Sequence, residues 1–194
     1  MAGRVLLAAV VSAVLLFMWG FVFWRLLNFG GKLMQPLPAE LDVLAMLRNS
    51  GAPSGMYVYP MADGSHDEED MSSFAAKHEN GPLLQLAYRA EGGPVMTPSM
   101  FGKGLGHYFS VALLTGMLLA FASGGLPSFG SRVLAVLLVS LVSAFWANGG
   151  DLIWWMHSPR YCLGNMAYTL GAGLLMALVT AAIVKQRPAE VTGN

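Results

Sequence analysis

Asp151 and His157 are the residues in the apolar second half of the chain with the clearest potential for chemistry. Asp151 follows Gly149 and Gly150, and His157 comes six residues later. A carboxylate at a helix centre within a membrane costs about 2.5–3.5 kcal/mol, so it marks a functional site by default. In that interpretation His157 or Arg160 is the partner of Asp151.

The structural alternative is a helix cap at the membrane surface. Residues 148–151 begin with Asn and end with Asp, and such side chains accept hydrogen bonds from the free N–H groups at a helix N-terminus. Trp154 and Trp155 then lie in the headgroup region, where indoles are enriched. We favour this cap over a catalytic or ligand role for Asp151.

His107 and His157 could also act together as ligands of a metal or a haem. The predicted topology places both near the outer face of the membrane, which permits shared coordination. The chain has no C-x-x-C-H sequence, which excludes the attachment of a c-type haem. We favour histidines that hydrogen-bond at the interface, and we expect no resident cofactor.

An acidic segment, residues 63–70, offers carboxylate oxygens beside one imidazole. His66, Asp67 and Asp70 are its weak candidates as ligands of a divalent cation. The ligand spacing of an EF-hand is absent, and contiguous like charges usually repel one another into water. We therefore favour a solvated acidic loop over a metal site.

Other signatures of chemistry are weak. Cys162 lacks the sequence context of a catalytic nucleophile, and residues 102–106 lack the G-K-[ST] ending of a phosphate loop. The 13 methionines suggest copper handling, but no M-x-M or M-x-x-M cluster recurs. We predict that the protein is not an enzyme.

Composition indicates the class of protein. Hydrophobic residues make up 55% of the 194 positions and charged residues 11%, against about 25% charged residues in soluble proteins. The 11 basic side chains balance the 11 acidic ones, so no concentrated basic face is available for nucleic acid. These values argue against a soluble enzyme and a disordered chain. They favour an integral membrane protein, whose partner is the lipid bilayer.

Four apolar runs predict an all-α membrane protein with four transmembrane helices, at residues 5–28, 107–123, 132–147 and 163–184. The first run is too long for a signal peptide and ends in an aromatic belt with Trp19 and Trp24, so we expect an uncleaved anchor. The second and third runs reach full length only if residues 103–106 and 148–154 add helical turns. The alternative is two spans plus a re-entrant hairpin.

Residues 29–106, between the first two spans, predict a small extracytoplasmic α+β insert. A helix is expected over residues 38–49, and strands are expected over residues 55–60 and 82–89. Two strands alone are marginally stable, so they must lean on other elements. The remaining divisions are the N-terminal span (1–28), a three-helix transmembrane region (107–184) and a tail (185–194).

The placement of basic residues predicts the orientation. Arg4, Arg132, Lys185 and Arg187 fall in short pieces that share one side of the membrane, whereas the acidic insert lies on the other side. This pattern predicts a multi-pass protein of the bacterial inner membrane with both termini cytoplasmic.

Several short motifs resemble those of a group of bacterial inner-membrane proteins that have no assigned activity. The motifs are Met18-Trp-Gly20, Gly55-x-Tyr57-x-x-Pro60, Gly81-Pro82 with the later Tyr88, Met96-Thr-Pro98, and Pro159-Arg-Tyr161. The resemblance implies four spans with a periplasmic insert, and it implies no catalytic residues.

Small residues at four-residue spacing, such as Ala9 with Ala13 and Ser140 with Ala144, predict close packing of the helices. Polar residues within the spans are few, which disfavours a path for solutes or protons. They include Thr115, Ser140, Ser143 and Asn165.

The leading hypothesis for function is a non-catalytic accessory or assembly subunit. In this hypothesis the protein binds a larger membrane protein complex, such as a respiratory or photosynthetic one, through its helices and its insert. One alternative is a metal- or haem-handling membrane protein that uses His107, His157 and Asp151. A further alternative is a small transporter.

Overall fold

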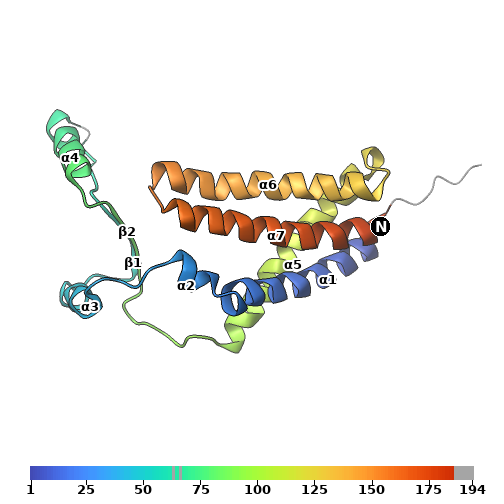
Figure 1. The fold of residues 1–194 in the computed structure, drawn as a ribbon, viewed down its shortest axis with the longest axis horizontal. Helices are drawn as coiled ribbons and strands as arrows, with labels where there is room; N and C mark the ends of the chain where they lie inside the picture. Colours follow the sequence, from blue (N-terminus) through green and yellow to red (C-terminus); the bar gives the residue numbers. More distant parts are fainter. Residues whose placement is uncertain (63, 66, 186–194) are drawn as a thin grey trace, which may run out of the picture. The chain divides into compact units, whose positions relative to one another are not determined.

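The computed structural model describes residues 1–62, 64–65 and 67–185. Among these residues, four helices are long and apolar enough to cross a membrane, which is consistent with a multi-pass membrane protein. They are α1 (Ala2–Phe21), α5 (Pro98–Phe121), α6 (Phe129–Trp154) and α7 (Pro159–Ile183) (Figure 1). The shorter elements beside them are a π-helical turn η1 (Val22–Leu26), α2 (Phe29–Leu33) and a 3-10 turn η2 (Ala122–Gly125).

Helix caps set the starts of α5 and α6. The Thr97 hydroxyl accepts a hydrogen bond at 3.1 Å from the backbone N–H three residues later, so α5 begins before its apolar run. Ser128 and Ser131 form a capping box at the start of α6. Residues 103–106 and 148–154 are helical, so both helices reach the length that a full span requires.

The four long helices form two pairs that are joined along one seam. α1 packs against α5, and α6 packs against α7 over their length (Figure 1). α1 also packs along α7, whereas α5 makes few contacts with α6 or α7. Ala9, Ala13, Ser140 and Ala144 are buried, which confirms the close packing that their spacing predicts.

Both described ends of the chain lie at the same end of the bundle. The Arg4 guanidinium donates to the carbonyl oxygen of Lys185 at 3.1 Å. Arg132, near the start of α6, donates from Nε to the carbonyl oxygen of Ala181, near the end of α7, at 3.1 Å. Three basic residues that the sequence analysis assigns to one side therefore share one end of the bundle.

Pro36–Val95 form a second compact unit of two helices and two antiparallel strands. The strand pair is called the hairpin, although a helix lies between its strands in the sequence. Its elements are α3 (Glu40–Asn49), β1 (Gly55–Tyr59), α4 (Glu68–Asn80) and β2 (Leu84–Tyr88). β1 and β2 pair in antiparallel register. The Ser54 hydroxyl closes the open end of the hairpin, because it donates to the Glu91 carboxylate at 2.7 Å and accepts from the Ala90 N–H at 2.9 Å. The hydrogen bond from Ser54 lowers the pKa of Glu91.

The prediction for this unit is confirmed for the first helix and both strands, but it is wrong for the acidic segment. Asp67 is the N-cap of α4, whose first turn holds three further carboxylates. The free N–H groups and the positive end of the helix dipole stabilise carboxylates there, and this offsets their mutual repulsion. Residues 29–35 and 96–106, which the sequence analysis places in the insert, belong with the long helices.

Arg132 is a buried cation, with 6% of its surface exposed. Besides Ala181, its guanidinium reaches the carbonyl oxygens of Leu126 and Pro127 from Nη1, at 3.2 and 3.0 Å. It therefore satisfies carbonyl groups at the C-terminal end of α7 and in the turn before α6. The forked guanidinium reaches these separate acceptors together, whereas a lysine ammonium is a single point charge.

We expect Arg132→Lys to lower the free energy of unfolding by about 2 kcal/mol, because hydrogen bonds that involve a charged group contribute about 1.5–3 kcal/mol. Unfolding by SDS in mixed micelles, followed by circular dichroism, measures the difference. The control Arg4→Lys alters an exposed hydrogen bond and should change stability by less than about 0.5 kcal/mol. Equal losses in the two variants would contradict an anchoring role for Arg132.

Candidate functional site: a polar cavity among the helices

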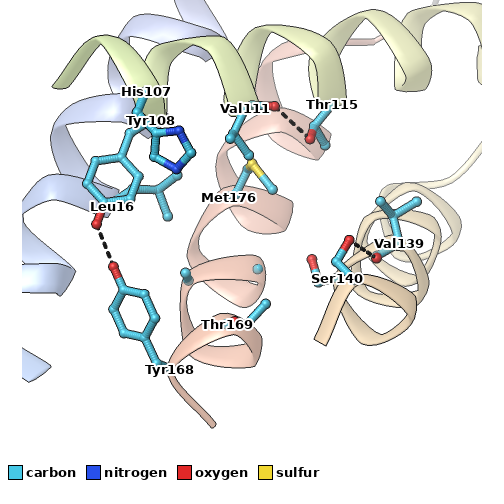
Figure 2. A pocket seen from close by; sticks show the side chains of 13 residues that line it. Leu16, His107, Tyr108, Val111, Thr115, Val139, Ser140, Tyr168, Thr169 and Met176 are labelled. Atoms are coloured by element: carbon cyan, nitrogen blue, oxygen red, sulfur yellow. Dashed lines mark hydrogen bonds between the residues drawn. The ribbon is translucent and has the colours of Figure 1, made fainter. Parts of the chain in front are cut away.

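A cavity of about 170 Å³ lies among the four long helices (Figure 2). Its lining comes from Leu16 of α1 and from residues between 107 and 115 of α5, 139 and 143 of α6, and 168 and 176 of α7. The stretches of α5, α6 and α7 lie near the middle of their helices. The cavity therefore occupies the space that α5 leaves by making few contacts with α6 and α7.

The floor of this cavity is buried and its rim is exposed. Thr115, Ser140 and Met176 are 8%, 5% and 6% exposed. Val111 on α5 and Val139 on α6 also line the cavity, and each is 37% exposed. The cavity therefore opens between α5 and α6.

Two tyrosines form one wall of the cavity. The hydroxyl oxygens of Tyr108 and Tyr168 are 2.6 Å apart and join α5 to α7 (Figure 2). Gly20 of α1 faces both hydroxyls, because a Cβ at this position would lie 3.2 and 3.3 Å from the two oxygens. The Trp19 indole donates to the backbone carbonyl of Tyr168 at 3.1 Å and stacks on its ring. Contacts from three helices thus fix this wall.

Trp19 and Trp24, which the sequence analysis assigns to an aromatic belt, contact the tyrosine wall. The π-helical turn η1 carries Phe23 into the bundle, where it is 3% exposed and stacks on Phe29 at 4.2 Å between ring centroids. The Trp24 ring lies 5.5 Å from the Tyr168 ring. π-Helical turns are frequent at functional sites, and this one supports the wall of the cavity.

The opposite wall carries hydroxyl groups whose hydrogens are already donated. Thr115, Ser140 and Ser143 each donate to the carbonyl oxygen four residues earlier in their own helix, at 2.9 Å. Their oxygens keep lone pairs that can accept hydrogen bonds. Figure 2 shows Thr115 and Ser140 across the cavity from the tyrosine pair. The cavity thus has one hydroxyl hydrogen left to donate at the tyrosine pair and acceptor oxygens on the opposite wall.

His107 lies inside α5, nine residues after the start of the helix, and its predicted position near the outer face of the membrane stays a prediction. The apolar run begins at His107, but the Thr97 cap starts the helix earlier. His107 lines the cavity, and its ring is 5.5 Å from that of Tyr108. His157 instead lies in the turn between α6 and α7, beside Tyr161. The two histidines therefore occupy different levels of the bundle.

Asp151 lies in the last turn of α6, so its predicted role as an N-terminal cap is wrong. A carboxylate at a helix C-terminus opposes the helix dipole. The imidazole of His157, when protonated, offsets this charge, with Nδ1 3.8 Å from Oδ2 of Asp151. The backbone N–H of His157 also donates to the backbone carbonyl of Asp151 at 3.0 Å, so the two residues close the α6–α7 turn. Trp154 and Trp155 beside them are 79% and 52% exposed.

Of the predicted metal ligands in the insert, His66 lies outside the described residues. Asp67 serves as the cap of α4, because its Oδ1 accepts the backbone N–H of Asp70 at 2.8 Å. In the part of the chain that the structure describes, no group of three or more His, Cys, Asp or Glu side chains is placed to hold a metal ion. A cavity of about 150 Å³ holds one benzene ring, so the cavity beside His107, as it stands, is too small for a tetrapyrrole.

No family model, curated protein or solved structure matches this chain. The interpretation of the site therefore depends on its own geometry. The resemblance of the short motifs to a group of bacterial inner-membrane proteins stays a prediction.

Sequence reasoning missed the cavity because it counted polar residues in the spans and found few. The structure gathers them in one place, together with Tyr108 and Tyr168. The available signal was helical spacing, since Thr115 lies eight residues after His107 and Ser143 lies three after Ser140. Such spacing places side chains on one face of a helix. It does not show that the faces of three helices converge.

The stability of α4 at acidic pH tests whether Asp67 caps this helix. The pKa of Asp67 is lowered because its carboxylate accepts hydrogen bonds from the Asp70 backbone and from Ser65. A lowered pKa means that the cap stabilises α4 above the unfolded pKa, near 3.8, and that this stabilisation is lost as the pH falls through the folded pKa. Amide exchange protection in α4, corrected for intrinsic rates, should therefore fall in that acidic range.

Two variants separate the cap from other acid effects. Asp67→Asn keeps an acceptor oxygen, so α4 should keep its protection at neutral pH and lose the part of the acid transition that Asp67 causes. Asp67→Ala should reduce protection at neutral pH as well. Full protection of α4 in Asp67→Ala would show that Asp67 is not its cap.

Proposed function

We propose that the protein is a non-catalytic accessory subunit that binds a larger membrane protein complex through its helices and its insert, Pro36–Val95. The main support is that the insert has little core of its own. Among its described residues, Pro60 alone is buried. A domain of about 60 residues that folds alone buries about 60% of the surface of its unfolded chain. The insert is therefore short of buried surface, and a partner can supply it.

The insert exposes large apolar side chains in place of a core. Leu41 of α3 is 82% exposed, Met56 of β1 is 66% exposed, and Met61 is 75% exposed. In the described part of the insert, β1 and β2 form a sheet of two strands, so each has one unpaired edge. Open edges and apolar faces are surfaces on which partner proteins add strands or dock helices.

The two faces of the hairpin differ in exposure. Tyr57, Leu86 and Tyr88 share one face by register and are half-buried, and the rings of Tyr57 and Tyr88 lie 6.4 Å apart. Met56 and Val58 lie on the other face and are exposed. The tyrosine face holds the hairpin together, which leaves the Met56 face for a partner.

We also propose that the protein lies in the bacterial inner membrane with both termini cytoplasmic and the insert periplasmic. Arg4, Arg132 and Lys185 share one end of the bundle, and basic residues concentrate in short cytoplasmic pieces of membrane proteins. Because α1 separates Arg4 from the insert along the chain, a spanning α1 places the insert on the opposite side.

Reporter fusions test this orientation. Alkaline phosphatase needs disulfides, which form in the periplasm, so a fusion at Ser65 should be active and a fusion at the C-terminus should be inactive. Green fluorescent protein at the C-terminus gives the complementary readout in the cytoplasm. Phosphatase activity at the C-terminus, or none at Ser65, would reverse the proposed orientation.

Site-specific crosslinking tests the partner-binding function. A photoreactive benzoylphenylalanine at Leu41 or Met56 should give one discrete adduct with the same membrane protein in the native host. The same residue at Lys77, which is exposed on the polar helix α4, is the control and should give none. Mass spectrometry of the adduct identifies the partner.

Substitution then measures the contribution of the same surface. Leu41→Asp with Met56→Asp should reduce co-purification of that partner at least tenfold, because burying one large apolar side chain contributes about 1.5–3 kcal/mol and 1.4 kcal/mol is tenfold. The amount of the variant in the membrane should stay unchanged. No discrete adduct, together with unchanged co-purification, would contradict an accessory role for the insert.

A further inference from the structure

We propose that the cavity among the four helices binds the head group of a membrane quinol, which is a six-membered ring with two opposed hydroxyl groups and an apolar tail. The proposal depends on the size, the opening and the hydrogen-bonding groups of the cavity. It is independent of the partner that the insert binds, so either proposal can fail alone.

The size of the cavity selects a single ring. An apolar protein cavity of about 150 Å³ takes up benzene. The present cavity, at about 170 Å³, has room for one ring with its oxygen substituents. Fused ring systems such as sterols exceed this volume.

The opening of the cavity selects a ligand with a tail. Val111 and Val139 form an exposed apolar rim between α5 and α6, and both helices are candidate membrane spans. A ring in the cavity can therefore extend an apolar tail through this opening into the lipid. A head group without a tail would leave the rim uncovered.

The polar groups in its lining distinguish this cavity from a groove that would hold lipid chains. A second hollow, between α1 and α5, is lined by apolar side chains and glycine, among them Val14 and Phe109. Such a surface suits an acyl chain. The quinol cavity instead combines the hydroxyl-bearing residues Tyr108, Tyr168 and Ser140 near the middle of the bundle.

The direction of the hydrogen bonds selects the reduced form of the ligand. The two tyrosine hydroxyls share one hydrogen between their oxygens, so the second hydrogen can be donated to a ligand oxygen. Ser140 and Thr115 have donated their hydrogens to their own helices, so they can only accept. A quinol accepts at one end and donates at the other, which matches both walls. A quinone only accepts, so its second oxygen would gain no hydrogen bond from Ser140 or Thr115.

Binding of a radiolabelled probe to the full chain in lipid nanodiscs tests the proposal. The probe is decylubiquinol under argon, and empty nanodiscs give the background from partition into lipid. We expect saturable binding at one probe per chain. Decylubiquinone should bind about tenfold more weakly, because one hydrogen bond is lost. Decylbenzene, which has the ring and tail without oxygens, should not exceed background.

Three variants assign the binding to this cavity. Tyr108→Phe removes one hydroxyl and should weaken quinol binding about tenfold. Ser140→Ala removes one of the acceptors on the opposite wall and should reduce the preference for the quinol over the quinone. Leu114→Ala alters an exposed side chain on the same helix, outside the cavity, and should bind as the wild type does. Thermal unfolding identifies any variant that is misfolded.

The results that would overturn the proposal are equally definite. Equal binding of decylbenzene would show a groove for lipid chains. Equal affinity of the wild type for quinol and quinone, or an unchanged preference in a folded Ser140→Ala variant, would show that the hydroxyl wall does not recognise the ligand. If Tyr108→Phe does not fold, the result for Ser140→Ala decides.

Discussion

The contact between Trp19 on α1 and Tyr168 on α7 holds the two halves of the helix bundle together. α1 with α5 and α6 with α7 are each well-packed pairs, but α5 makes few contacts with α6 or α7. The main joint between the pairs is therefore the α1–α7 seam, where the Trp19 indole donates to the Tyr168 carbonyl. The hydrogen bond between the Tyr108 and Tyr168 hydroxyls adds one link from α5 to α7. Gly171 makes the contact possible, because a Cβ at this position would lie 2.5 Å from the Trp19 ring. A side chain at Gly171 would force the pairs apart.

The same arrangement explains why polar residues occur at mid-length in otherwise apolar helices. When one seam joins two pairs, the helices farthest from the seam diverge and leave space between them. Thr115 and Ser140 border that space and satisfy their hydroxyl hydrogens within their own helices. The Tyr108 and Tyr168 hydroxyls share one hydrogen bond. The polar groups are thus tolerated without a ligand.

The helices and strands could be predicted from the sequence because the hydropathy of a short segment depends only on the residues within it. The four apolar runs correctly predicted the four long helices, and composition and flanking prolines predicted both strands of the insert. The errors arose at helix ends. The Thr97 cap starts α5 nine residues before His107, where the apolar run begins. Helix α6 extends to Trp154, so Asp151 lies near a C-terminus and not at the expected N-terminus. The cavity could not be read from sequence at all, because it depends on which helices diverge.

The single seam also gives the bundle a mechanical property. Rotation of one helix pair about the α1–α7 axis displaces atoms in proportion to their distance from that axis. The seam itself changes least, and the opening between α5 and α6 changes most. Packing within each pair survives such a movement, which is the usual condition for hinge motion of rigid bodies. Such a movement changes the width of this opening before any helix loses its own hydrogen bonds, and the Tyr108–Tyr168 hydrogen bond from α5 to α7 limits it.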